Sequence, residues 1–209
     1  MTSFEKIYKP FLASVQDIGI GYLTKEEFYE TLEGYLIKSV VLDFKECTNS
    51  LEYISNEEFT YKFRGNGFRE EYFIDCDIKN TIYSTTLFQN GELIDECYYN
   101  IDSKNLILTL EFRAGAEDTL ELKLKEIGYF VEELTQEEIS ILAEIMVLHW
   151  LRKQINREEN LQASISTSDF KKTSNANLLD KLLALAEKQE QIIDSYKVKY
   201  SMTGFDGFY

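Results

Sequence analysis

Apolar residues in the first fifty positions recur at helical spacing. Thr24-Lys25-Glu26-Glu27 has the form of a capping box, in which the threonine hydroxyl and the glutamate carboxylate satisfy the first free amides of a helix. We therefore predict a helix from Thr24 that buries one face, and a shorter helix before it whose end is left open by Pro10. The apolar stripe of the longer helix follows steps of three and four and consists of Phe28, Leu32, Tyr35, Leu36, Val40 and Phe44.

The apolar period changes to two between about residue 52 and residue 130. The residues from Phe59 to Phe63 alternate between aromatic and polar side chains, which is typical of a strand with one buried face. Asn90-Gly91, a dipeptide that favours a tight hairpin, separates apolar runs at Thr81 to Phe88 and at Leu93 to Tyr99. Together these strands predict a small antiparallel sandwich or sheet. Further strands are predicted at Phe68 to Ile74, Leu106 to Phe112 and Leu120 to Leu124.

The last third of the chain returns to helical spacing. A second capping box, Thr135-Gln136-Glu137-Glu138, opens a helix that reaches about Ile155. Apolar residues lie almost all round this helix between Ile139 and Leu151, which predicts a central position. A final leucine-rich helix is predicted from Leu178 to about Tyr200.

These patterns predict an α+β protein, with a helical body from the N- and C-terminal zones and an inserted antiparallel β-sheet or small sandwich. We assign residues 1–50 and 132–200 to the helical body, residues 51–131 to the β insertion and residues 201–209 to an extended tail. Aromatic residues in such a tail have little local chain to bury them, so we expect them to fray or to dock on another chain. They are Phe205, Phe208 and Tyr209.

Composition and charge exclude several classes of protein. The chain has 209 residues, 44% of them hydrophobic, with one proline and ten glycines, which is enough for one substantial core and leaves little room for flexible linkers. The formal net charge is −15. Because a protein that grips a duplex needs clustered lysine and arginine, we predict no sequence-specific binding of nucleic acid. Repulsion would suit a conduit through which DNA slides.

The cysteines and the apolar runs bear on localisation. Cys47, Cys76 and Cys97 stand far apart, so we interpret them as reduced side chains. The N-terminus lacks the charged and then apolar pattern of a signal segment, and no run of about 18 apolar residues is present. We therefore expect no membrane span and folding in the cytoplasm.

Candidate catalytic residues are few. His149 is the single histidine, so Ser–His catalysis and a multi-histidine metal site are excluded, and its place beside Trp150 favours a core or interface role. Paired glutamates could act in glycosidic hydrolysis, but the capping boxes account for two of the pairs. Gly19-Ile20-Gly21 lacks the third glycine of a nucleotide-binding loop. We predict that the protein is not an enzyme and has no cofactor, no metal site and no catalytic residues.

The aromatic residues of the strands leave an alternative open. Such residues usually serve packing on a sheet, but exposed ones could stack on sugars or act as anchors at a protein interface. The alternative function is therefore an accessory protein- or carbohydrate-binding module, with protein docking favoured over sugar binding. The residues concerned are Tyr61, Phe63, Tyr72, Phe73, Tyr98 and Tyr99.

The C-terminal helical zone carries a family resemblance. Its pattern is Leu134-Thr135-x-x-Glu138-Ile139-x-Ile141-Leu142-Ala143-x-x-Met146-x-x-x-Trp150-Leu151, followed by Glu159-Asn160-Leu161, Ser168-Asp169-Phe170 and the leucine-rich helix. This zone resembles the head–tail connector proteins, also called neck ring or adaptor proteins, of tailed bacteriophages.

The resemblance implies a structural virion protein that is assembled in the host cytoplasm and located in the virion neck. Copies would form a homo-oligomeric ring, usually a dodecamer, between the portal protein and the tail or a second connector protein. The ring would continue the DNA channel, help to retain the packaged genome and attach the tail, while DNA passes without sequence-specific binding. The candidate interface residues are Trp150, His149, Phe205, Phe208 and Tyr209.

Overall fold

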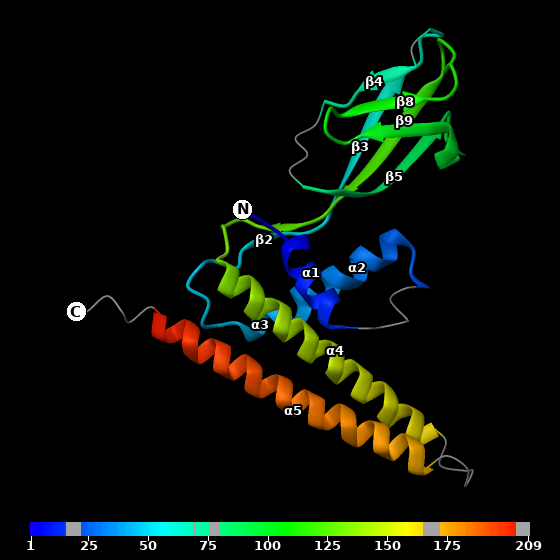
Figure 1. Ribbon diagram of the computed structural model, residues 1–209. Helices are drawn as coiled ribbons and strands as arrows, with labels where there is room; N and C mark the ends of the chain where they lie inside the picture. The colour runs from blue at the N-terminus through cyan, green and yellow to red at the C-terminus, as the bar shows by residue number, and fades with distance from the viewer. Residues whose placement is uncertain (16–21, 69, 76–79, 165–171, 204–209) are drawn as a thin grey trace, which may run out of the picture. The chain divides into compact units, whose positions relative to one another are not determined.

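The computed structural model describes residues 1–15, 22–68, 70–75, 80–164 and 172–203 (Figure 1). The chain divides into two compact units. The helical unit comprises Met1–Gly21, Thr31–Glu52 and Phe130–Tyr209, and the β unit comprises Tyr22–Glu30 and Tyr53–Tyr129. The predicted α+β class is confirmed, because helices at both ends of the sequence flank antiparallel sheets in the middle.

The first helix, α1 (Glu5–Ser14), contains Pro10 and continues past it for one turn. Phe4, Ile7 and Phe11 are fully buried along one face, which is the i, i+3, i+7 spacing of an amphipathic helix. The sequence left the end of this helix open, and the structure sets it at Ser14, whose hydroxyl donates a hydrogen bond to the carbonyl of Pro10 (3.1 Å).

The second helix, α2 (Lys25–Tyr35), starts at the predicted capping box. The backbone amide of Thr24 donates to Glu27 Oε2 (2.9 Å), and the amide of Glu27 donates to Thr24 Oγ1 (3.3 Å). The helix then continues through a π-helical turn, η2 (Leu36–Val40), into the short α3 (Val41–Asp43). The predicted helix from Thr24 is therefore confirmed, although the sequence did not indicate the π turn.

The π turn keeps one apolar row on one face of the helical unit. Leu32, Leu36, Val40 and Phe44 follow one another at steps of four and are all buried. An α-helix has 3.6 residues per turn, so a row at steps of four would drift round it. A π turn holds more residues than an α turn, which corrects the drift and directs the row towards the core.

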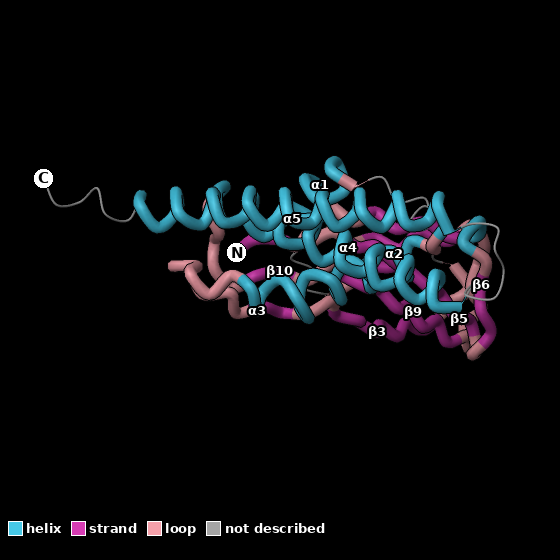
Figure 2. Tube along the Cα trace, turned by 90° about the horizontal axis from the view of Figure 1, so that it is seen from below, coloured by secondary structure: helices cyan, strands magenta, loops and turns pink. Residues whose placement is uncertain are grey.

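The two longest helices form an antiparallel hairpin in the helical unit (Figures 1 and 2). They are α4 (Gln136–Ser164) and α5 (Lys172–Thr203). Because α4 contacts α1, η2 and α5, its predicted central position is confirmed. Both helices extend beyond the predicted limits. The prediction of an extended tail from residue 201 is wrong for Ser201 to Thr203, which are helical, and residues 204–209 lie outside the described part of the chain.

The β unit contains two antiparallel sheets that form a small sandwich, which is one of the two predicted alternatives. The strand orders are β3-β9-β5-β6 and β4-β8-β7. The remaining strands, β1 (Thr2–Ser3), β2 (Tyr53–Ile54) and β10 (Tyr129–Phe130), are short. The sandwich strands are β3 (Glu57–Arg64), β4 (Glu71–Phe73), β5 (Ile82–Gln89), β6 (Glu92–Ile94), β7 (Tyr99–Asp102), β8 (Ile107–Leu110) and β9 (Thr119–Glu126).

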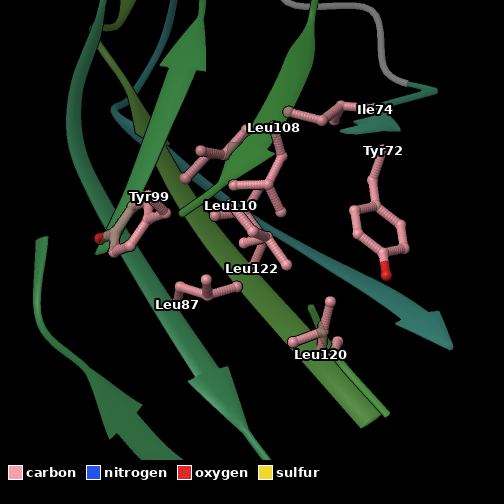
Figure 3. Packing of buried hydrophobic residues seen from close by; sticks show 10 residues of the cluster. Tyr72, Ile74, Leu87, Tyr99, Leu108, Leu110, Leu120 and Leu122 are labelled. Carbon is pink, nitrogen blue, oxygen red and sulfur yellow. The ribbon is translucent and has the colours of Figure 1, made fainter. Parts of the chain in front are cut away.

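Leucines from both sheets close the core of the sandwich (Figure 3). Leu120, Leu122 and Leu124 alternate along β9 and are fully buried, because successive side chains of a strand point to opposite faces. Leu108 and Leu110 of β8 join the same cluster. The alternation recognised in the sequence thus sets which face of each sheet is inside.

The turns of the sandwich follow from backbone geometry. Asn90 and Gly91 have φ values of 53° and 87°, as a tight hairpin turn between β5 and β6 requires. Gly65 has no room for a side chain, since a Cβ there would lie 2.0 Å from the carbonyl oxygen of Gly115. Glycine at position 91 permits the positive φ of the turn, and glycine at position 65 lets two segments approach closely.

Two predicted strands are too long. The predicted strand from Leu93 to Tyr99 ends as β6 at Ile94, because the side chain of Asp95 accepts a hydrogen bond from the amide of Cys97 and starts a 3₁₀ turn, η3 (Glu96–Tyr98). The predicted strand from Phe68 to Ile74 is reduced to β4. Aspartate side chains that bond nearby amides compete with the strand ladder, and a count of apolar residues does not detect this.

Candidate interaction surface

The seam between α4 and α5 has the spacing of a coiled coil. Ala186, Gln189 and Ile193 are buried in steps of three and four along α5, and Tyr200 lies seven residues further on. A repeat averaging 3.5 residues keeps one side of a helix facing its partner. Other apolar residues of α5 lie outside this inner seam, and several of them are exposed.

One polar residue sits within this seam. Gln189 is only 9% exposed, and its Nε2 donates to the backbone carbonyl of Glu144 (3.1 Å) and to the Glu144 carboxylate (2.5 Å). A polar side chain in an apolar seam sets the register of two helices, because a shifted register leaves it without a partner. Gln189 thus holds α5 in one position along α4.

A buried carboxylate in the first turn of α4 joins the start of α4, the end of α5 and the loop after α3. Glu138 is fully buried and accepts hydrogen bonds from the amide of Thr135 (2.7 Å), the hydroxyl of Tyr200 (2.6 Å) and Nδ2 of Asn49 (2.8 Å). The thiol of Cys47 lies 3.3 Å from the same carboxylate. The predicted capping box is confirmed, and its glutamate also holds the end of α5 against the start of α4.

The hydrogen bonds around Glu138 and its burial determine the protonation states of Glu138 and Cys47. Burial acts to raise the pKa of Glu138, but the hydrogen bonds from Tyr200, Thr135, Asn49 and Cys47 outweigh burial and lower the pKa to about 2. Burial, and then the adjacent Glu138, raise the pKa of Cys47 to about 12. At neutral pH the site holds a charged carboxylate and a neutral thiol, so its role is to bind structural elements together.

Other apolar residues of α5 are exposed. Leu178 is 44% and Leu185 is 52% exposed, and Ile192 is half-buried. They stand seven residues apart, close to two helical turns, so they lie in one line along the helix. We call these three residues the α5 outer row. Apolar side chains in a line on an exposed helix face mark a candidate interaction surface.

The structure gives His149 a contact inside the helical unit. His149 Nε2 lies 2.8 Å from Asp43 Oδ2, and the side chain of His149 is only 18% exposed. Trp150 is half-buried and also has a contact. Their interface role stays a prediction. The other three candidates, Phe205, Phe208 and Tyr209, lie outside the described residues.

The aromatic residues of the strands do not share one face. Tyr72 and Tyr99 are buried in the sandwich core, and Tyr61 and Phe63 are partly buried against it. Two others are exposed, Phe73 by 73% and Tyr98 by 53%. Most of this set therefore serves packing.

Among the described residues, no group of three or more His, Cys, Asp or Glu side chains is placed to hold a metal ion. In that same part of the chain, no helix is long and apolar enough to cross a membrane. Two acidic pairs contain capping glutamates, Glu27 and Glu138, in agreement with the sequence interpretation.

The chain matches no protein-family model and no curated protein. Sequence reasoning identified Glu138 only as a capping residue, because its bond to Tyr200 joins positions 62 residues apart. The sequence does contain one signal for this surface. It is the seven-residue spacing of apolar residues in α5, which indicates both the hairpin seam and the outer row.

Proposed function

We propose that the chain is a structural subunit of the neck of a tailed bacteriophage, where copies form a ring between the portal and the tail. The ring continues the DNA channel, helps to retain the packaged genome and attaches the tail. The observation that carries this proposal is the α5 outer row, an exposed apolar line on a long helix that is held rigidly by its partner.

The helical hairpin suits a ring subunit mechanically. At 32 residues, α5 is about 48 Å long, and Gln189 and Glu138 hold it in register with α4. In a closed ring, one patch of each subunit meets a different patch of the next. A rigid helix that exposes leucines supplies one such patch without rearrangement of the subunit.

The charge of the chain supports a conduit. The net charge of −15 makes the surface repel a phosphate backbone, since phosphate binding requires lysine or arginine to release counterions. DNA can move through a ring of such subunits without being held.

Oligomeric state tests the proposal directly. The full chain is examined by light scattering and negative-stain electron microscopy, alone and with a portal protein, and rings are expected. The double variant Leu178→Glu/Leu185→Glu should lose them, because two added charges would enter each apolar interface between neighbouring subunits. The matched control Gln191→Glu adds charge at another exposed position of α5 and should assemble normally. A full chain that stays monomeric with and without portal would contradict the ring.

A second function has its own observation. Phe68 is 85% exposed and Phe73 is 73% exposed on the β unit, and exposed aromatic residues are frequent anchors in protein interfaces. This favours docking of a partner protein on the β unit. If the double variant Phe68→Ser/Phe73→Ser abolishes tail attachment while rings still form, the β unit acts as the docking module of the assembly.

A further inference from the structure

A pocket of about 380 Å³ lies in the helical unit between α1, the first turns of α4 and the last turns of α5. Its lining includes Pro10 of α1, Ile141 of α4, and Tyr196 and Lys199 of α5. A cavity of about 150 Å³ accepts one benzene ring. The pocket therefore has room for about two aromatic side chains.

The lining combines apolar surface with three charged side chains, Lys199, Glu137 and Glu144. Pro10, Ile141 and Tyr196 supply the apolar surface, and the Lys199 ammonium lies 5.9 Å from the centroid of the Tyr196 ring. Of the two acidic residues in the lining, Glu144 is already hydrogen-bonded to Gln189, and Glu137 is exposed. Apolar pockets with a few polar groups at the edge are typical sites for aromatic anchors.

We propose that this pocket receives the Gly204–Tyr209 segment of a second copy of the chain. The inference rests on the proposed ring and specifies how neighbouring subunits are joined. The segment has three aromatic rings, at Phe205, Phe208 and Tyr209, and one carboxylate, at Asp206. The pocket has room for about two of these rings against its apolar surface, and the carboxylate matches Lys199.

The α5 outer row leads to this pocket. Lys199 follows Ile192 by seven residues, as Ile192 follows Leu185, so the pocket lies at the end of the same line on α5. A neighbouring copy that covers the outer row is therefore placed beside the pocket. Six residues span at most about 20 Å when extended, which is enough to cross from that neighbour into the pocket.

Peptide binding tests the pocket without the ring. A fluorescein-labelled peptide with the sequence of residues 203–209 is titrated into protein lacking residues 204–209, and anisotropy is measured. Saturable binding is expected. A peptide with alanine in place of all three rings should bind at least tenfold more weakly, because aromatic anchors supply most of the energy of such contacts. Absence of saturable binding would overturn the inference.

A charge exchange locates the binding site. The Lys199→Asp protein should bind the peptide about tenfold more weakly, and a peptide with Asp206→Lys should recover most of that loss. Lys188→Asp changes another exposed lysine of α5 in the same way and should leave binding unchanged. Thermal unfolding shows whether each variant is folded. Equal weakening by the two lysine substitutions would place the peptide elsewhere and overturn the inference.

The full-length protein separates this inference from the proposed function. Rings that form from full-length protein while the truncated protein binds no peptide would overturn the inference alone. A full-length monomer that binds the peptide would contradict the ring but support the pocket as the receptor of this segment. A full-length monomer that does not bind the peptide, although the truncated protein does, would show that the segment fills the pocket of its own chain.

Discussion

The helical unit and the β unit are stabilised in different ways. The β unit closes a leucine core between two sheets and covers its outer face with ion pairs, such as Lys62 with Glu121 (3.2 Å) and Lys125 with Glu30 (3.0 Å). The helical unit also has an apolar core, but one buried carboxylate joins its distant segments, and leucines of α5 remain in solvent. Both units therefore expose apolar side chains, Phe68 and Phe73 in the β unit and leucines of α5 in the helical unit, but those of α5 form a row along one long helix, where an assembly would gain most.

Paired leucine substitutions give the largest expected difference between the units. Leu122→Ala removes a fully buried side chain of the β unit and should lower its free energy of unfolding by about 2–5 kcal/mol. Leu185→Ala in the helical unit should change the stability of the isolated chain by less than about 0.5 kcal/mol, while weakening assembly. Urea unfolding and light scattering measure the two effects. Similar losses of stability would show that Leu185 is a core residue.

Glu138 should make the helical unit sensitive to acid. Its folded pKa of about 2 lies below the usual value of 4.5, so its stabilising effect is complete above about pH 5 and is lost as the pH falls towards 2. The difference corresponds to roughly 3 kcal/mol. Glu138→Gln should remove this part of the pH dependence, whereas Glu137→Gln, at an exposed neighbour, should keep it. If the stability of the unmodified protein, Glu138→Gln and Glu137→Gln depends on pH in the same way, the Glu138 network is not the source of the acid sensitivity.

The two capping boxes allow a smaller comparison. Thr24→Ala and Thr135→Ala each remove a threonine that accepts a hydrogen bond from a helix amide and should cost about 1 kcal/mol. Thr135→Ala should also disturb the bonds between Glu138, Tyr200 and Asn49, so we expect it to cost more. Unfolding in urea measures both. A larger loss for Thr24→Ala would contradict the central role of the Glu138 network.

Thiol labelling compares one cysteine of each unit and does not rely on a change in stability. Cys97 of the β unit is exposed, whereas Cys47 is half-buried and held neutral beside Glu138. Because the thiolate is the reactive form, a thiol reagent at pH 8 should label the exposed Cys97 faster than Cys47, although the hydrogen bond with Asp95 also raises the pKa of Cys97. The measurement uses a Cys76→Ser background, with mass spectrometry of peptides. Glu138→Gln should speed the labelling of Cys47, and unaltered protection in that variant would show that burial alone protects the thiol.

Several elements of the fold were predictable because their determinants are close together in the sequence. The starts of α2 and α4 depend on a threonine and a glutamate three residues apart, and the alternation of β9 follows from the strand period of two. The apolar row from Leu32 to Phe44 was also recognised. The π turn within it was not, because it is selected by packing against α4.

The candidate surface was predictable only in part for the same physical reason. The apolar and polar order of the sequence by itself determined the α+β class, the starts of α2 and α4 and the inner and outer positions of the strands, since these depend on neighbours within a few residues. The tertiary structure decided which residues of α5 are buried, which donors reach Glu138 and where the pocket opens. Each of these depends on segments brought together from distant positions, such as Asn49, Thr135 and Tyr200, and local periodicity carries no information about such pairings.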